Sequence, residues 1–351
     1  MQQPFLCISR KNIRLAGLFL FFIMLLFTSG CGLNPASIAT VTPTIISPTP
    51  EVTPTPSPLG SADNPLRIGI NIQTDNDPAQ IAGEELAAKL NELTDLNFKF
   101  VYFTNATDLS GAARDNSIQL AWLNPIEYIE LKQDNGFDAG LLTNHYGVYA
   151  YGAQFIANKD SGFTSYFDPS NNKNTSEELT VLNQFDSKRP CLVDNNSLSG
   201  SLVPLGLLAK EGILYADPIY THSHTAIIRA LYIKGICDFG ATFSVTGDPR
   251  TSSAVLNDLP DALTRVEIIW QTPAVIPNLN LSYATNVSAG DRQNINSAFL
   301  EIVKSEAGKS MISTALNYEV SDIKIVDDSI YDDLREILNA TSADLNKIIE
   351  Q

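Results

Sequence analysis

Positively charged residues are scarce in this chain, and histidine is scarcer still. The 351 residues include 23 Lys and Arg against 39 Asp and Glu, which gives a formal net charge of −16, and only 3 His. Proteins that bind nucleic acid neutralise phosphates with a basic face, so this balance argues against DNA or RNA as a partner. It does not exclude a small anion, because backbone amides produce a local field that a diffuse acidic surface does not cancel.

Cysteine is equally rare, with four residues in the chain. Cys7 lies in the N-terminal segment and Cys31 follows it, so only Cys191 and Cys237 remain in the rest of the sequence. There is no Cys-x-x-Cys pair, which argues against a redox-active dithiol. Both cysteines lie in apolar, strand-like stretches. They can form a disulfide in an oxidising compartment or remain two buried small side chains, and the sequence leaves this open.

Metal-binding and catalytic motifs are also missing. His222 and His224 would share one side of a strand, but a metal requires further ligands and only His145 remains. The sequence GKS at 308–310 lacks the P-loop glycine, because Val303 occupies its position. In SLSGS the central serine is not flanked by two glycines, as it is in the GxSxG nucleophile elbow. We therefore predict no metal, no cofactor and no enzymatic activity.

The first 64 residues are typical of targeting and spacer segments. Basic residues precede the apolar run AGLFLFFIMLLFTSG, which has the length of a signal-peptide core and is shorter than the ~20 residues of a membrane span. The run ends at Cys31 and resembles a bacterial lipoprotein signal, in which this cysteine is lipidated, although Thr28 replaces the usual leucine. We predict a signal peptide over 1–30 and a Pro/Thr/Ser-rich flexible linker over 31–64; an uncleaved anchor helix is the alternative.

From Leu66 onward, strand-like and helix-like segments alternate. The strand-like LRIGINI, FKFVYF and IQLAWL are each followed by a helical pattern, and the same rhythm returns after about Tyr151. This order predicts an α/β fold with mainly parallel sheets covered by helices. Two such blocks predict two lobes with a central ligand cleft, because α/β sheets bind ligands beyond the carboxyl ends of their strands.

Four polar stretches follow predicted strands, where the amides of a helix N-terminus are free to bind an anion. Two have ordinary structural explanations, because residues 75–77 can cap a helix and Asn124 can cap one that begins with Pro125. Residues 197–201, Ser-Leu-Ser-Gly-Ser, contain more hydroxyl groups than capping requires. In the fourth stretch, His224 opens a predicted helix and is placed to donate to an anion.

Several of these motifs occur together in one known family. LRIGINI, IQLAWLNP, YGAQFIANKDSGF, DNNSLSGSLVP, THSHTAIIRAL, CDFGA and IIWQTPAVIPN follow one another over about residues 66–305. The series resembles the extracytoplasmic phosphate/phosphite/phosphonate-binding proteins of ABC importers. The resemblance implies a type II periplasmic-binding fold in which the chain crosses between lobes twice. Residues 65–150 and 260–351 would then form one lobe and residues 151–259 the other.

The resemblance also implies a ligand site. In this family the loop usually reads Ser-Thr-Ser-Gly and holds the oxyanion, and here Leu198 replaces the threonine. The family's histidine falls on His224, and a family tyrosine falls on Tyr151. The predicted ligand-binding residues are Ser197, Ser199, Gly200, Ser201, His224, Tyr151 and Asn124.

Other family positions depart from the pattern. A tyrosine of the first lobe falls on Ala106, and the acids that some members use for a ligand ammonium fall on Val245 and Leu279. The loss of both acids argues against an aminoalkylphosphonate. Phosphate, phosphite, a phosphonate with an uncharged tail or another small ligand remains open.

The expected protein is a monomeric solute-binding lipoprotein outside the bacterial cell membrane. It would capture a small phosphorus oxyanion and deliver it to the permease and ATPase subunits of an ABC importer. A two-lobed sensor or surface protein of changed specificity, uncoupled from transport, is the main alternative, because a fold does not determine a role. A hydrolase is a third interpretation, which no motif supports.

Overall fold

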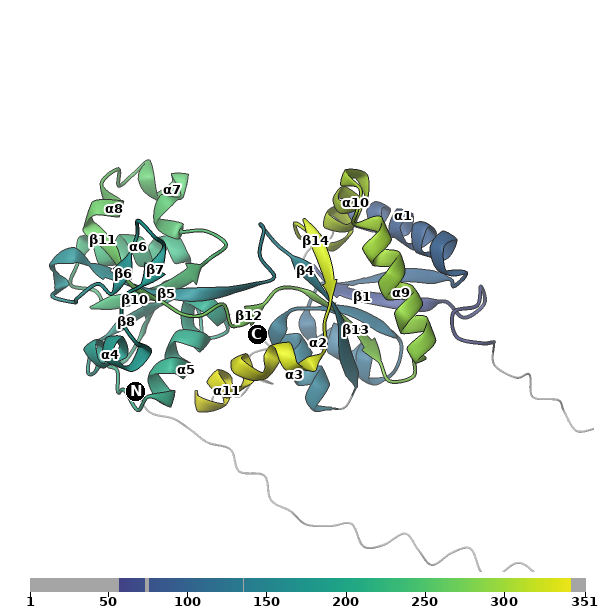
Figure 1. Ribbon diagram of the computed structural model, residues 1–351, viewed down its shortest axis with the longest axis horizontal. Coiled ribbons are helices and arrows are strands. Elements are labelled where there is room, and N and C mark those ends of the chain that lie inside the picture. Colours follow the sequence, from purple (N-terminus) through teal and green to yellow (C-terminus); the bar gives the residue numbers. More distant parts are fainter. Residues whose placement is uncertain (1–56, 73–75, 135, 342–351) are drawn as a thin grey trace, which may run out of the picture. The chain divides into compact units, whose positions relative to one another are not determined.

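The computed structural model describes residues 57–72, 76–134 and 136–341. The predicted signal peptide, the lipidation site at Cys31 and most of the linker lie outside the described residues. Within them, the strands form two six-stranded sheets and one two-stranded sheet. Figure 1 shows the two larger sheets, each with its own helices.

The first sheet has the strand order β14-β4-β13-β3-β1-β2. Its strands are β1 (Leu66–Asn71), β2 (Phe98–Phe103), β3 (Leu120–Leu123), β4 (Phe137–Asn144), β13 (Asn280–Ala284) and β14 (Asp322–Ile325). One face packs against α1 (Asp77–Thr94), α9 (Ala289–Ile302) and α10 (Glu306–Leu316), and the other against α2 (Ala106–Arg114) and α3 (Pro125–Gln133) (Figure 1). Each face of this sheet therefore has its own apolar core. The strands β1 and β3, with their carboxyl ends, lie between these two packed layers.

The second sheet has the order β11-β5-β10-β8-β9, and β12 pairs with β5. Its strands are β5 (Ala150–Asn158), β8 (Pro190–Leu192), β9 (Ile219–Tyr220), β10 (Phe239–Ser244), β11 (Val266–Gln271) and β12 (Ile276–Pro277). The helices α6 (His224–Ile233), α7 (Ser253–Leu256) and α8 (Ala262–Arg265) cover one face; α4 (Glu178–Leu182) and α5 (Val203–Lys210) cover the other (Figure 1). The short strands β6 (Phe167–Asp168) and β7 (Lys173–Asn174) pair separately.

Short turns of other helix types complete the described chain. Four are 3₁₀ turns, at Lys159–Ser161, Asn183–Phe185, Pro249–Thr251 and Asp328–Tyr331. Residues Leu198–Leu202 form a π-helical turn that leads directly into α5.

The expectation of mainly parallel sheets is wrong, because both sheets are mixed. β1 lies parallel to β2 and β3, and β8 lies parallel to β9 and β10. In contrast, β13 is antiparallel to β3 and β4, and β5 is antiparallel to β10 and β11. Two consecutive strands of one sheet can be parallel only if a crossover segment joins them. Here the chain enters β5 directly after β4, and it enters β13 directly after β12. Both strands therefore arrive from the other sheet, and this sets their antiparallel direction.

The chain passes between the two sheets twice, after β4 and again after β12. The second passage lies later than the expected boundary at residue 260, because β11 and β12 both pair with β5. β5 begins at Ala150. The family resemblance implied the boundary at residue 260, but the turns around it connect elements of the second sheet.

The end of the predicted linker is ordered against the first sheet. Gly60 has φ of +86°, and its carbonyl accepts a hydrogen bond from the Asn97 amide at 2.8 Å. A Cβ at this position would lie 2.8 Å from Leu96 Cδ2, so glycine meets both a backbone and a packing requirement. The folded part of the chain therefore begins a few residues before Leu66.

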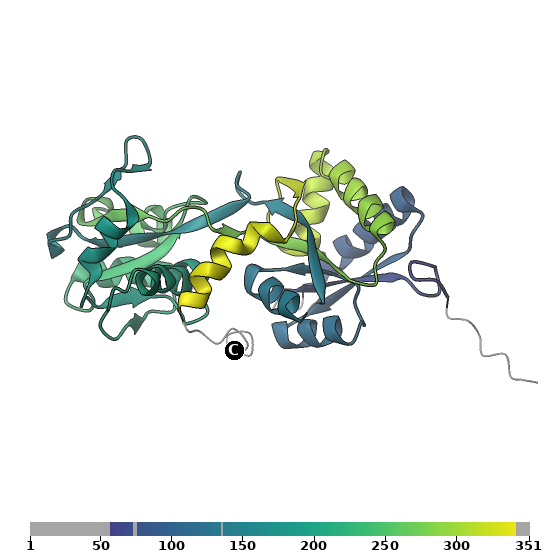
Figure 2. The ribbon, with the colours of Figure 1, turned by 60° about the horizontal axis from the view of Figure 1, so that its bottom comes forward.

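The last described helix, α11 (Asp332–Ala340), packs against α5 (Figure 2). Gly206 permits the contact, because a Cβ there would lie 2.4 Å from the Ile337 carbonyl oxygen. Before the helix, the Tyr128 hydroxyl donates to Asp328 at 2.6 Å and the Asn280 side chain donates to the Tyr331 hydroxyl at 2.7 Å. This segment therefore bonds to elements of the first sheet while its helix packs on a helix of the second.

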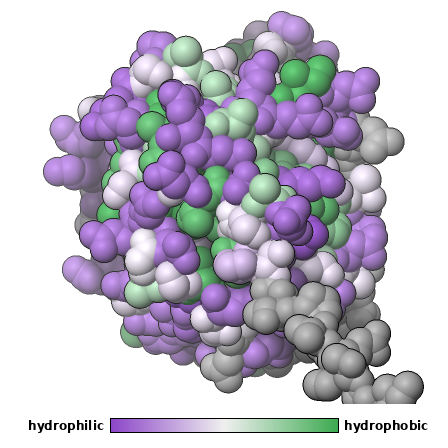
Figure 3. Space-filling model, turned by 90° about the vertical axis from the view of Figure 1, so that its right-hand side faces the viewer, coloured by the Kyte–Doolittle hydropathy of each residue, from purple (hydrophilic) through white to green (hydrophobic). Residues whose placement is uncertain are grey.

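The surface is mainly polar on the face shown in Figure 3, where hydrophobic residues are scattered among hydrophilic ones. This agrees with the acidic composition. None of the helices in the described part of the chain is both long enough and apolar enough to cross a bilayer.

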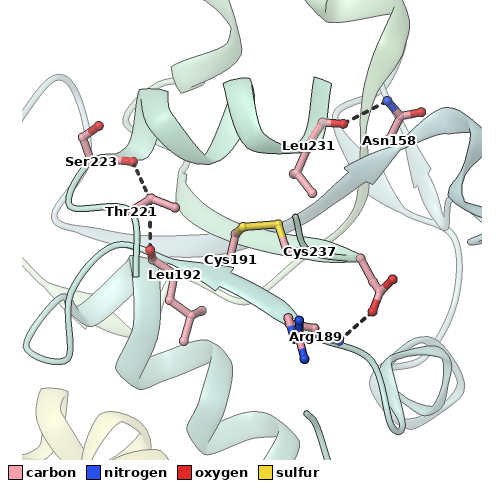
Figure 4. Close-up of a disulfide and its surroundings, with 9 residues drawn as sticks. Asn158, Arg189, Cys191, Leu192, Thr221, Ser223, Leu231 and Cys237 are labelled. Atoms are coloured by element: carbon pink, nitrogen blue, oxygen red, sulfur yellow. Dashed lines mark hydrogen bonds between the residues drawn. A yellow bond between two sulfur atoms is a disulfide. The ribbon is translucent and has the colours of Figure 1, made fainter. Parts of the chain in front are cut away.

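A disulfide joins Cys191 in β8 to Cys237, just before β10 (Figure 4). This resolves the alternative that the sequence left open. The parallel pairing of β8 with β10 places Gly240 beside Cys191, and both cysteines are at most 8% exposed. The link closes a separation of 46 residues, and Cys191 lies in the strand that directly precedes the loop containing residues 197–201.

Removing this link should destabilise the protein. A loop of this size predicts a loss of about 4 kcal/mol in the free energy of unfolding for Cys191→Ala with Cys237→Ala. Urea unfolding followed by circular dichroism measures this loss. The control is the wild-type protein under reducing conditions, which breaks the disulfide but keeps both cysteine side chains. An unchanged urea midpoint in both samples would show that the disulfide contributes nothing to stability.

Candidate functional site

Residues 197–202, called the serine turn below, connect β8 to α5. The Leu202 amide donates to the Ser197 carbonyl at 2.9 Å, which gives the wide π-type turn in place of an ordinary helix start. The Ser197 hydroxyl accepts from the Gly200 amide at 3.2 Å. A Cβ on Gly200 would lie 2.4 Å from Val193 Cγ2, so glycine is needed for packing. Such π turns are rare and often occur at functional sites.

The hydroxyl groups inside the serine turn are shielded from solvent. Ser199 is 5% exposed and Ser201 is 1% exposed. The Ser201 hydroxyl is buried and has no hydrogen-bond partner among the described residues. Leaving such a group unpaired costs about 1–3 kcal/mol, so it calls for a partner. The serine turn thus holds a buried polar atom that has no partner in the described part of the chain.

Leu198 has a different role from that of its neighbours. It is 9% exposed and belongs to the apolar core beside Leu202 and Val203. Leu198, which stands where the family has a threonine, therefore adds a buried apolar side chain to the core beneath the serine turn.

His224 is the first residue of α6. Its N-cap, Ser223, accepts a hydrogen bond from the Ala226 amide at 3.1 Å, which sets where the helix begins. The imidazole meets the Phe243 ring edge to face at 4.9 Å, and its Nδ1 is buried with no partner in the described part of the chain. Burial lowers the pKa of His224 to about 4. The ring is therefore neutral at pH 7 and has one N–H to donate.

The serine turn and the His224 turn are tied together through the end of β8. The Val193 amide donates to the Gly200 carbonyl at 3.2 Å, and the Val193 carbonyl accepts from the His222 amide at 3.0 Å. Next to it, the Thr221 hydroxyl donates to the Leu192 carbonyl at 3.0 Å (Figure 4). The structure therefore brings together five of the predicted residues: Ser197, Ser199, Gly200, Ser201 and His224.

His222 does not share this environment. Its side chain is 79% exposed and its Nδ1 lies 2.5 Å from Asp194 Oδ1. The described residues contain no group of three or more His, Cys, Asp or Glu arranged to hold a metal.

Asn124 caps α3, as its position before Pro125 suggested. Its side chain accepts from the Ile126 and Glu127 amides, both at 3.0 Å, and the Glu127 carboxylate accepts from the Asn124 amide at 2.9 Å. This is a complete capping box. Asn124 also lines a cavity at the carboxyl ends of β1 and β3, with a volume of about 210 Å³.

Tyr151 lies near the start of β5, opposite Ile276 of β12. It packs against the apolar core, and burial raises the pKa of Tyr151 to about 12. The phenol is therefore protonated at neutral pH and keeps its O–H to donate. Of the remaining polar stretch, residues 73–75 lie outside the described part, and Asn76 caps α1 by accepting from the Ala79 amide at 3.2 Å.

Sequence reasoning missed Glu127. This residue lines the same cavity as Asn124 and is 3% exposed. Burial raises the pKa of Glu127 to about 7, against the opposing effect of hydrogen bonds from the Asn124 amide and the Asn71 side chain. The spacing Asn-Pro-x-Glu does indicate a capping box, but nothing in it shows that the glutamate faces a cavity.

The positions that depart from the family pattern lie in three different places. Ala106 begins α2 directly after its cap, Asn105. Val245 follows β10 with φ of +75° and is 46% exposed. Leu279 lines the cavity that contains Glu127.

Comparison with known proteins identifies the family. Residues 68–331 match the family of periplasmic substrate-binding proteins of phosphonate ABC transporters. The chain belongs to this family. No curated protein sequence gives a significant match.

Solved structures confirm the fold at low sequence identity. XAC2383 from Xanthomonas citri, in a structure bound to ATP, is 14% identical with a TM-score of 0.57, covering 81% of this chain and 98% of that one. Mh-p37 from Mycoplasma hyorhinis is 12% identical with a TM-score of 0.51, covering 81% and 100%. The expected α/β, two-lobed type II periplasmic-binding fold is thus confirmed. The family consists of extracytoplasmic substrate-binding components of transporters, not enzymes.

The partly buried imidazole of His224 predicts a specific pH dependence of stability. Its pKa is about 4 in the folded protein, against 6.5 for a histidine that is not buried, so the unfolded chain binds more protons between these values. The free energy of unfolding should therefore fall as pH drops from 6.5 to 4, by at most about 3 kcal/mol from this group.

His224→Gln should remove that part of the decline. Urea unfolding at pH 7.5 and at pH 5 measures it as the difference between the variant and the wild type, which cancels the effect of other titrating groups. His222→Gln serves as the control for loss of an exposed imidazole. Equal pH dependence in wild type and His224→Gln would contradict the buried, neutral state of His224.

Proposed function

We propose that this chain is the lipid-anchored solute receptor of an ABC importer and that it binds a small phosphorus oxyanion of the phosphate, phosphite or phosphonate class. The oxyanion is held by Ser197, Ser199, Gly200 and Ser201 of the serine turn and by His224. Tyr151 and Asn124 contribute from other elements when the lobes close over the ligand. The protein then delivers the ligand to the permease, and no bond is made or broken.

The observation that carries this proposal is the pair of buried, unpaired polar atoms at the end of β8. Ser201 Oγ and His224 Nδ1 both lack partners in the described part of the chain, and the turns that contain them are joined through Val193. Buried polar groups in folded proteins are nearly always paired, so two such atoms on adjacent turns support a ligand site.

The site needs no basic side chain to hold an anion. Hydrogen bonds to a charged partner contribute about 1.5–3 kcal/mol each, so a few fixed donors are sufficient for tight binding. The neutral His224 supplies an N–H and can gain a proton when an anion arrives, since a nearby negative charge raises the pKa of an imidazole. Hydroxyls, amides and one neutral ring therefore suit an oxyanion in a protein of net charge −16.

The N-terminal residues supply the proposed anchor. Lipidation of Cys31 would attach a monomeric protein to the outer side of the cell membrane, and residues 32–56 would act as the spacer. This spacer is shorter than the predicted linker of residues 31–64, because Gly60 already bonds to Asn97 and packs against Leu96.

Loss of the two unpaired atoms should abolish oxyanion binding. Methylphosphonate, phosphite or phosphate at about 100 times its Kd should stabilise the wild type by about 2.7 kcal/mol, which raises Tm by several degrees. Ser201→Ala with His224→Ala should lose this shift, as measured by a thermal-shift assay. Asn196→Ala, at an exposed position next to the serine turn, is the matched control.

The same oxyanion-dependent shift in the double variant would refute the assignment of the site. No shift for any of the three ligands in the wild type would refute the proposed ligand class.

A further inference from the structure

The cavity of the first sheet is large enough for part of a ligand. Its lining residues are Ile70, Asn71, Ile72, Trp122, Asn124, Glu127, Leu279, Leu316, Asn317 and Tyr318. A volume of about 210 Å³ exceeds the ~30 Å³ that one water molecule occupies in the liquid, so several non-hydrogen atoms can enter. The cavity lies at the carboxyl ends of β1 and β3, where α/β sheets bind ligands.

The charge of this lining is unsuited to the oxyanion itself. Among the described residues that line the cavity, Glu127 is the only acid, and none is a lysine, arginine or histidine. At pH 8, above the pKa of Glu127, the carboxylate repels an anion placed next to it. Ile70, Leu279 and Leu316 add apolar walls. The cavity therefore fits a part of the ligand that carries no negative charge, and Asn124 is the one lining residue proposed to contact the oxyanion.

Glu127 provides a hydrogen-bond acceptor in the cavity. Its two oxygens accept from the Asn71 side chain at 3.2 Å and from the Asn124 amide at 2.9 Å. A carboxylate has about four acceptor sites, so capacity remains after these two bonds. A capping-box glutamate needs only one of them for its helix, and here the side chain is almost fully buried.

Trp122 provides the complementary donor. It lines the same cavity, is 0% exposed and packs edge to face against Phe299 with ring centroids 5.6 Å apart. Its indole Nε1 is buried and has no partner among the described residues. An indole N–H can only donate, so the group that pairs with it must be an acceptor.

We infer that this cavity receives an uncharged, hydroxyl-bearing tail of the ligand whose oxyanion binds the serine turn. A hydroxyl has both a donor for the Glu127 carboxylate and an acceptor for the Trp122 indole N–H. An ammonium has donors only and leaves the indole N–H unpaired, and an alkyl tail pairs with neither. This inference rests on the proposed function and narrows its ligand to hydroxyalkyl phosphonates.

Isothermal titration calorimetry with four phosphonates of similar size tests the inference. The ligands are 2-hydroxyethylphosphonate, 2-aminoethylphosphonate, propylphosphonate and methylphosphonate, titrated at pH 8 into the full chain. We expect the hydroxyethyl ligand to bind at least tenfold more tightly than the propyl ligand, which is the effect of about one hydrogen bond to a charged group.

Two variants assign the preference to its residues. Glu127→Gln and Trp122→Phe should each reduce the ratio of hydroxyethyl to propyl affinity about tenfold. Glu130→Gln is the matched control, because Glu130 is a buried acid on the same helix that bonds to Ser110 and Arg114 instead. It should keep the wild-type ratio.

The wild-type panel alone can overturn the inference, even if a variant fails to fold. Equal affinity for all four ligands would refute the tail subsite and leave the proposed function standing. Tighter binding of 2-aminoethylphosphonate than of the hydroxyethyl ligand would show that the cavity selects a cation and would equally refute the inference. No binding of any of the four would refute both the proposed ligand class and the inference.

Discussion

The backbone of one residue, Val193, connects the parts of the proposed oxyanion site. Its amide donates to the serine turn at Gly200, and its carbonyl accepts from the turn that precedes His224. Val193 directly follows β8, which lies between β10 and β9 in the second sheet. The disulfide at Cys191 lies two residues earlier. The sheet, the disulfide and these two hydrogen bonds together place a buried serine hydroxyl and a partly buried imidazole on adjacent turns.

Different roles for the two lobes follow from the chemistry of their side chains. The second sheet carries hydroxyls and a neutral histidine, which suit an anion, whereas the first sheet carries a buried carboxyl, an unpaired indole and apolar walls. If the lobes close on one ligand, they contact chemically different ends of it. The segment from Asp328 to α11 bonds to the first sheet's elements and packs on α5, so it would have to accommodate any such closure.

Much of the fold could be predicted from the sequence, because local signals agree with the final structure. The starts of α3 and α6 follow Asn124 and Ser223, whose side chains cap them as their positions indicate. Strand direction was predicted wrongly, since the alternation of elements does not show that β5 and β13 arrive from the other sheet. The predicted boundary at residue 260 also placed β11 in the wrong lobe. Its pairing with β5 joins residues that are far apart in the sequence, and no local pattern shows it.

The candidate site was predictable only where residue type and local position suffice. Ser197, Ser199, Gly200, Ser201 and His224 stand in recognisable turns. The burial of Glu127 and the missing partner of the Trp122 indole depend on residues from β1, α10 and the segment before β13. Leu198 looked like a lost ligand contact, and the structure places it in the apolar core. Such distinctions require knowing which side chains meet, and no local pattern contains that information.

The most direct test of the central claim is a crystal structure of the protein with a bound phosphonate. We predict that the oxyanion lies within hydrogen-bond distance of the Ser201 hydroxyl and the His224 ring, with its tail directed toward Glu127. An oxyanion bound elsewhere, with the serine turn making no contact to it, would contradict this claim.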